Sequence, residues 1–175
     1  MQKKCLIACS ILGILIACTS HRPVSSEVHL AANAPSDQPI ALSDITSAEK
    51  LYAAMAPCSR KAMSAFGAVR ERYRRGLPPK QSLFVVTRLE DTEHHRETVF
   101  VVADSMKKSR VFGRIWSPIQ LVRGYRLGQP ISLEERDLID WMISRPDGSE
   151  EGNLLGKFVD KMQAEKRLPT ELCRP

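Results

Sequence analysis

Apolar residues recur at helical spacing in the first half of the chain. Between residues 58 and 75 they fall on one side of a helix with 3.6 residues per turn. The apolar positions are Ala62, Phe66, Val69 and Tyr73. Gly76 and two prolines follow, and these residue types end helices. The pattern predicts an amphipathic helix over residues 58–75.

A shorter helix is predicted just before it. Thr46 and Glu49 have the three-residue spacing of a capping box, in which the two residues satisfy the first free N–H groups of a helix. Pro57 either ends this helix or begins the next, because proline lacks the N–H that a helix interior needs. We therefore expect two N-terminal helices, over residues 46–56 and 58–75.

From residue 82 onwards the hydrophobic period becomes two, which is typical of β-strands. Four to five short strands are predicted, over residues 82–89, 97–103, 110–116, 130–133 and 141–144. The segments between them are predicted to be a hairpin at 91–96, a charged turn at 105–109, a loop at 117–128 and a helical turn at 134–140. A last amphipathic helix is predicted over residues 155–166. Helices, then an antiparallel meander, then a helix indicate an α+β fold.

The first 17 residues predict export. Lys3 and Lys4 precede an apolar run of thirteen residues, 5–17, which is too short to span a membrane and has the length of a secretory signal. The run ends Leu15-Ile16-Ala17-Cys18, which resembles the lipobox of bacterial lipoproteins. This resemblance implies cleavage between Ala17 and Cys18 and a lipid on the Cys18 thiol. The alternative is an ordinary signal peptide followed by a coincidental cysteine.

Residues 18–43 are rich in proline, serine and alanine and lack an apolar period, so they predict a tether between lipid and domain. A single α+β domain is expected over residues 44–175. Thr19 is not the aspartate that retains enterobacterial lipoproteins at the inner membrane. The sequence therefore predicts a cell-envelope protein, anchored most simply in the outer membrane and facing the periplasm.

The cysteine count fits this localisation. Cys5 and Cys9 leave with the signal peptide and Cys18 carries lipid, so one pair remains in an oxidising compartment. We predict a disulfide between Cys58 and Cys173. The alternative is two free buried thiols.

Composition excludes several classes. The chain has 175 residues, of which 43% are hydrophobic, with nine glycines and eleven prolines; collagen-like, low-complexity and multispan membrane proteins are excluded. The net charge is +6. Basic residues gather on the second predicted helix, namely Arg60, Lys61, Arg70, Arg72, Arg74 and Arg75. They form either a solvated helix face or a contact surface for anionic lipid, glycolipid or an acidic protein. An exported domain rarely meets nucleic acid, so none is expected as a partner.

Few residues suggest chemistry. The sequence has no GxSxG, HExxH or CxxC pattern, and the adjacent His94 and His95 would point to opposite sides of a strand. We predict no catalytic residue, no metal site and no cofactor. Asp140 and Trp141 are the best candidates for ligand contact. The alternative is structural, with Asp140 binding backbone N–H groups and Trp141 filling the core.

Residues 66–162 resemble a bacterial family, the domain of unknown function 2314 (YegJ-like proteins). The resemblance is carried by Gly113-Arg114-Ile115, Pro118, Gly128-Gln129-Pro130-Ile131-Ser132-Leu133 and Leu138-Ile139-Asp140-Trp141-Met142. The chain departs from the family at Phe100, where a tryptophan is frequent, and the 113–118 passage is about one residue shorter. The family implies a fold and no established chemistry.

Together these observations predict a lipoprotein whose domain is a non-catalytic binding or interaction module of the cell envelope. Its expected partners are the membrane, through the lipid on Cys18, and an envelope protein or anionic surface. Two alternatives remain open. One is a hydrolase or transferase acting on envelope material, and the other is an inhibitor that binds a toxin.

Overall fold

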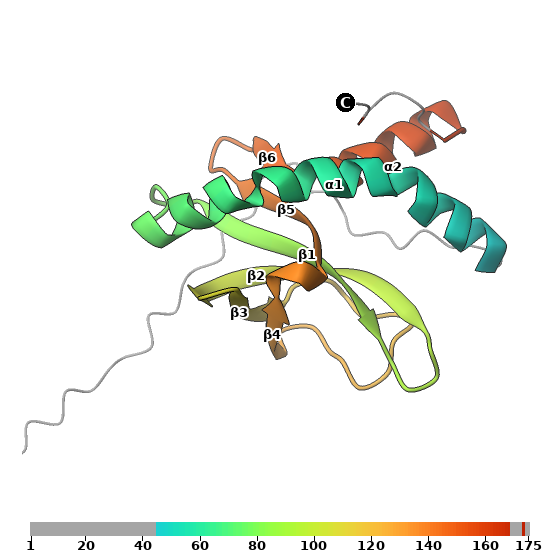
Figure 1. Cartoon of the computed structure of the whole chain (residues 1–175), viewed down its shortest axis with the longest axis horizontal. Helices are drawn as coiled ribbons and strands as arrows, with labels where there is room; N and C mark the ends of the chain where they lie inside the picture. The colour runs from blue at the N-terminus through green and yellow to red at the C-terminus, as the bar shows by residue number, and fades with distance from the viewer. Residues whose placement is uncertain (1–44, 169–172, 174–175) are drawn as a thin grey trace, which may run out of the picture.

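A six-stranded antiparallel sheet and two helices make up the domain (Figure 1). The computed structural model describes residues 45–168 and residue 173. The elements in chain order are α1 (Ile45–Arg75), β1 (Ser82–Glu90), β2 (Arg96–Lys107), β3 (Arg110–Ile115), β4 (Pro130–Glu134), the 3-10 turn η1 (Glu135–Asp137), β5 (Leu138–Ser144), β6 (Glu150–Gly152) and α2 (Leu154–Glu165). The predicted α+β class is confirmed, with six strands rather than four to five.

The N-terminal helices are one helix. α1 continues through Pro57, and Figure 1 shows it bent along its length, as a proline inside a helix causes. The prediction of two helices was therefore wrong, and so was Thr46 as a cap, because α1 already begins at Ile45. Burial offsets the cost of the proline, since Leu51 and Cys58 on either side of it pack against α2.

Two turn predictions also need correction. β2 continues to Lys107, so the predicted turn at 105–109 is reduced to Lys108 and Ser109. β2 stays paired with β3 as far as Lys107, with a register shift between Ala103 and Ser105. The predicted helical turn at 134–140 is limited to η1, because residues 138–140 already belong to β5. The hairpin between β1 and β2 is confirmed.

The strand order is β4-β3-β2-β1-β5-β6, so the sheet is not a simple meander. After β4 the chain returns to the far side of β1, where β5 pairs antiparallel to it. β6 has three residues and lies outside β5. It was not predicted, because three residues are too few to show a period of two. β4 and β6 form the two edges.

One face of the sheet carries the main core. α1 covers part of this face with Ala62, Phe66 and Val69, as the helical spacing predicted. The segment between β3 and β4, residues 116–129, joins the same cluster with the buried Val122. We call this segment the β3–β4 loop. The opposite face holds a smaller cluster of Phe84, Val102 and Met142. The core is thus closed by a helix and by a loop.

A disulfide joins Cys58 in α1 to Cys173, with Cα atoms 4.9 Å apart, as the cysteine count predicted. Both cysteines are buried beside Leu155 and Phe158 of α2. The predicted signal peptide, the predicted lipidation site Cys18 and the predicted tether lie outside the described residues. Within the described part, no helix combines the length and apolar content that crossing a membrane requires.

Candidate binding surface

A buried carboxylate holds the β3–β4 loop to the sheet. Glu97 is only 8% exposed and lies on the core side of β2, on the same face of the strand as Val99 and Val101. Its carboxylate accepts backbone hydrogen bonds from Gln120 (2.9 and 3.1 Å), Leu121 (2.8 Å) and Val122 (3.2 Å). Three successive N–H groups of the loop are thereby satisfied by one side chain.

Asp91, in the β1–β2 hairpin, holds the next residue of the loop. Its Oδ2 accepts a hydrogen bond from Arg123 N at 2.9 Å, and its Oδ1 accepts from Glu93 N and His95 N. Burial raises the pKa of Asp91, but the hydrogen bonds from Arg123 and from His95 lower it by a larger amount. The net pKa therefore lies well below its ordinary value. Asp91 therefore stays ionised, and the hairpin and the loop are tied together.

The fixed loop presents two leucines to solvent. Leu121 is 59% exposed and Leu127 is 56% exposed, whereas most large apolar side chains of the described residues are covered. Arg123 and Arg126 lie between them in the sequence and are also exposed, and residues 116–129 contain no aspartate or glutamate. Figure 1 shows this loop beside the β1–β2 hairpin, away from both helices. The loop is an aliphatic, positively charged surface on a rigid support.

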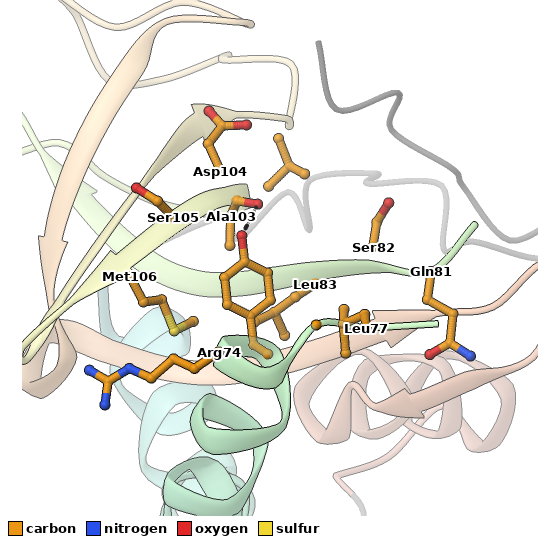
Figure 2. A pocket seen from close by; sticks show the side chains of 12 residues that line it. Arg74, Leu77, Gln81, Ser82, Leu83, Ala103, Asp104, Ser105 and Met106 are labelled. Atoms are coloured by element: carbon orange, nitrogen blue, oxygen red, sulfur yellow. Dashed lines mark hydrogen bonds between the residues drawn. The ribbon is translucent and has the colours of Figure 1, made fainter. Parts of the chain in front are cut away.

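An open hollow of about 500 Å³ lies where α1 ends beside β1 and β2. Figure 2 shows Leu77 and Leu83 among the residues that line it, together with Gln81, Asp104 and Ser105. Tyr73 from α1 donates a hydrogen bond to Ala103 O at 3.0 Å. Burial, and secondarily the charge of Asp104, raises the pKa of this phenol.

The charged groups of the hollow are already bound within the domain. Arg74 donates to Lys108 O at 2.6 Å, and Asp104 accepts two hydrogen bonds from Arg114 Nε and a third from Arg114 Nη2. The hollow therefore offers a ligand apolar side chains and the uncharged polar groups of Gln81 and Ser105, and we do not assign it a function.

The structure places Asp140 and Trp141 in the interior. Asp140 Oδ1 accepts from Trp141 N, and Oδ2 accepts from Leu155 N at the start of α2, both at 2.7 Å. Burial raises the pKa of Asp140 to about 6, against the opposing effect of these hydrogen bonds. The indole Nε1 of Trp141 donates to Ala62 O at 2.8 Å. Both residues thus join β5 to the helices, and their contact with a ligand remains a prediction.

The predicted basic surface of α1 is partly neutralised. Arg70 donates to both carboxylate oxygens of Glu135, at 2.9 and 2.7 Å, and this pairing raises the pKa of Arg70. Arg72 contacts Glu151 at 2.9 Å, and Arg74 contacts Glu71 at 3.1 Å. Three of the six cations therefore contact carboxylates.

The other three cations of the predicted surface are Arg60, Lys61 and Arg75. They are exposed and make no ion pair with another described residue. They are spread over α1, with Arg75 fifteen residues from Arg60. Contact of this helix with an anionic surface therefore remains a prediction, and only these three of the six cations of the predicted surface are outside ion pairs with described residues.

The histidines of the hairpin contact separate acids. His94 Nδ1 lies 2.8 Å from Glu90 Oε1, and His95 Nδ1 lies 3.0 Å from Asp91 Oδ2. Over the described residues, no cluster of three or more metal-ligating side chains is found.

Sequence reasoning missed the β3–β4 loop as a site. One signal was present: Glu97 shares the alternation of Val99 and Val101, which places a carboxylate on an apolar face. Such a residue needs a hydrogen-bond partner in the folded protein. Its partner, the backbone of residues 120–122, could not be identified from sequence spacing.

A comparison with models of protein families found a match that covers most of this domain. A family described as an uncharacterized protein conserved in bacteria (DUF2314) matches residues 48–170. The chain belongs to the DUF2314 family. The DUF2314 match is longer than the resemblance predicted over residues 66–162. It also includes most of α1 and extends beyond the end of α2. No curated protein and no solved structure matches the chain.

Proposed function

We propose that this DUF2314 protein is a lipid-anchored, non-catalytic binding module of the cell envelope, and that the β3–β4 loop is its binding surface. The observation that carries the proposal is the pair of exposed leucines, Leu121 and Leu127, on a loop whose backbone is bonded to Glu97 and Asp91. Loops fixed on a rigid scaffold commonly carry binding residues.

The envelope part of the proposal rests on the leader sequence. The lipobox-like Leu15-Ile16-Ala17-Cys18 would leave a lipidated Cys18 at the new N-terminus. The disulfide between Cys58 and Cys173 agrees with an oxidising compartment such as the periplasm. A tether of about twenty-five residues gives a reach of about 25–30 Å from the membrane.

The anchor is tested with the full-length protein and its Cys18→Ser variant. We expect the natural protein to fractionate with membranes and to incorporate labelled palmitate, and the variant to do neither. Equal palmitate labelling of the two proteins would overturn lipidation at Cys18.

The binding surface is tested by photo-cross-linking in cells. A photoreactive residue replaces Leu121, Leu127 or, as a control, Leu168, which is 42% exposed outside the loop. Adducts with lipid or protein are expected at 121 and 127 and not at 168. Adducts at all three positions, or at none, would contradict the loop as a binding surface. Covalent trapping of an envelope substrate analogue elsewhere on the domain would instead favour a hydrolase or transferase.

A further inference from the structure

We infer that the β3–β4 loop docks the domain on an anionic lipid bilayer, with Leu121 and Leu127 entering the interface. The inference rests on the proposed function, since it names what the same loop binds. Two observations favour a bilayer over a protein: which side chains of the loop face outward, and how its backbone N–H groups are satisfied.

The loop exposes two leucines, and its two aromatic side chains are half-buried against the domain. Trp116 packs on Phe84 with ring centroids 6.2 Å apart, and Tyr125 packs against the main core. Aromatic residues are enriched at protein interfaces, and leucine is under-represented among their hot spots. Leucine side chains instead favour transfer into the apolar side of a membrane interface.

Part of the loop backbone already has its N–H groups hydrogen-bonded within the domain, as a poorly hydrated environment requires. The N–H groups of four successive residues, 120–123, donate to the carboxylates of Glu97 and Asp91. An unsatisfied N–H group is costly wherever water is scarce, and this cost limits which loops can approach hydrocarbon. A loop with these groups already bonded can bring Leu121 to the interface without exposing them.

The charges of the loop suit an anionic surface. Arg126 is exposed and makes no ion pair with another residue in the described part of the chain. Arg123 is also exposed, although its guanidinium contacts Glu93 on the hairpin. Long arginine side chains can hold their charge at the headgroups while neighbouring apolar side chains insert. Asp91 and Glu97 face the loop from the hairpin and β2, and their carboxylates are directed to its backbone.

A weak contact is sufficient for an anchored domain. The lipid proposed on Cys18 confines the domain near the bilayer, which gives the loop a high effective concentration at the surface. Docking would then orient the domain with the β3–β4 loop toward the membrane and the two helices away from it (Figure 1).

The test uses the whole mature chain from residue 18, carrying Cys18→Ser so that no lipid contributes. Binding is measured by co-sedimentation with vesicles of equal parts phosphatidylglycerol and phosphatidylcholine, and with vesicles of phosphatidylcholine alone. We expect binding to the anionic vesicles that falls with salt. The double variant Leu121→Ser, Leu127→Ser should bind at least tenfold more weakly, and Leu168→Ser, the matched control, should bind as the parent does.

A substitution that strengthens vesicle binding provides a second test. Leu121→Phe adds apolar area at the same exposed position and should bind the anionic vesicles more tightly than the parent. Arg126→Gln should weaken binding to anionic vesicles and reduce its dependence on salt. Equal unfolding transitions of all variants show that the fold is unchanged.

Two results would overturn the inference. One is a double variant that binds the anionic vesicles as tightly as the parent, and the other is a parent chain that binds no vesicle. If the parent binds no vesicle while residues 121 and 127 still cross-link to a protein in cells, the bilayer is excluded and the proposed function stands. If cross-links at 121 and 127 are also absent, both proposals fail.

Discussion

Gly152 lies against Trp141 with no space between them for a side chain. A Cβ atom on Gly152 would lie 2.3 Å from the backbone oxygen of Trp141 and 2.7 Å from its Cε3 atom. Gly152 also has a φ of +81°, a conformation that glycine adopts without strain. The contact sets how closely β6 can approach β5, and through Asn153 it sets where α2 begins.

Replacing Gly152 by alanine should destabilise the domain strongly. The left-handed backbone costs about 1–2 kcal/mol for a residue with a Cβ atom, and the overlap with Trp141 adds about 1–3 kcal/mol. We expect the free energy of unfolding in urea to fall by about 3 kcal/mol. Gly124→Ala is the matched control, because Gly124 has a φ of +83° and a Cβ atom added to it would have no neighbour within 4 Å. Equal losses in the two variants would show that the Trp141 contact has no effect.

Glu97→Gln should loosen the β3–β4 loop. The amide has one acceptor oxygen and an NH₂ group that would face the loop N–H groups, so part of the hydrogen bonding from residues 120–122 is lost. We expect a loss of about 2 kcal/mol in unfolding free energy. Hydrogen exchange at these three amides should become faster, as read by NMR. Glu93→Gln, at an exposed position of the hairpin, should change stability by no more than about 0.5 kcal/mol and leave those amides protected.

Asp140 should make the domain less stable as the pH rises from about 4 to about 6. Burial raises its pKa in the folded protein to about 6, from an ordinary value of 3.8. Between these values the folded protein retains a proton that the unfolded chain has released, so stability decreases with pH. The total effect is about 3 kcal/mol.

The measurement compares urea unfolding of the parent and of Asp140→Asn from pH 4 to pH 7. The asparagine cannot titrate, so the difference in unfolding free energy between the two proteins should change between about pH 4 and about pH 6 and be nearly constant above that. Other carboxylates contribute equally to both proteins and cancel. A difference that is independent of pH would refute the raised pKa of Asp140.

Loss of the disulfide should lower stability by about 4 kcal/mol, because it closes a chain segment of 115 residues. Cys173→Ala is expected to match the reduced parent protein in its urea midpoint. Adding reductant should shift the midpoint of the parent and leave that of the variant unchanged. A parent protein insensitive to reductant, with its thiols shown to be free, would contradict a stabilising disulfide.

Local pattern was sufficient for much of this fold. The apolar residues of β1, β2 and β3 predicted these strands, although the first six residues of β1 are all buried and do not alternate. The stripe of Phe66 and Val69 predicted which side of α1 is buried. The pairing of β5 with β1 was not predictable in this way. It depends on contacts between residues far apart in sequence, such as Val85 and Trp141.

The candidate surface was less accessible to sequence reasoning. Leu121 and Leu127 lie in a stretch that reads as an ordinary loop, and nothing local indicates that their side chains face solvent while Val122 is buried. The distinction arises from Glu97, twenty-three residues before Gln120, whose carboxylate determines the path of the backbone. For the basic residues of α1, the sequence showed the candidate surface but not its partners. Their charge was evident from the sequence, whereas their ion pairs with Glu135 and Glu151 could be identified only from the tertiary structure.

The position of Cys173 has a consequence for biogenesis. In a chain that is synthesised from its N-terminus, this cysteine is added after every helix and strand that the structure describes. Covalent closure to Cys58 therefore has to follow synthesis of all these elements. A polypeptide that is truncated before this point would lack the bond, and would be easier for proteases to unfold and degrade. The late cysteine would thus act as a mark of chains that contain all of these elements.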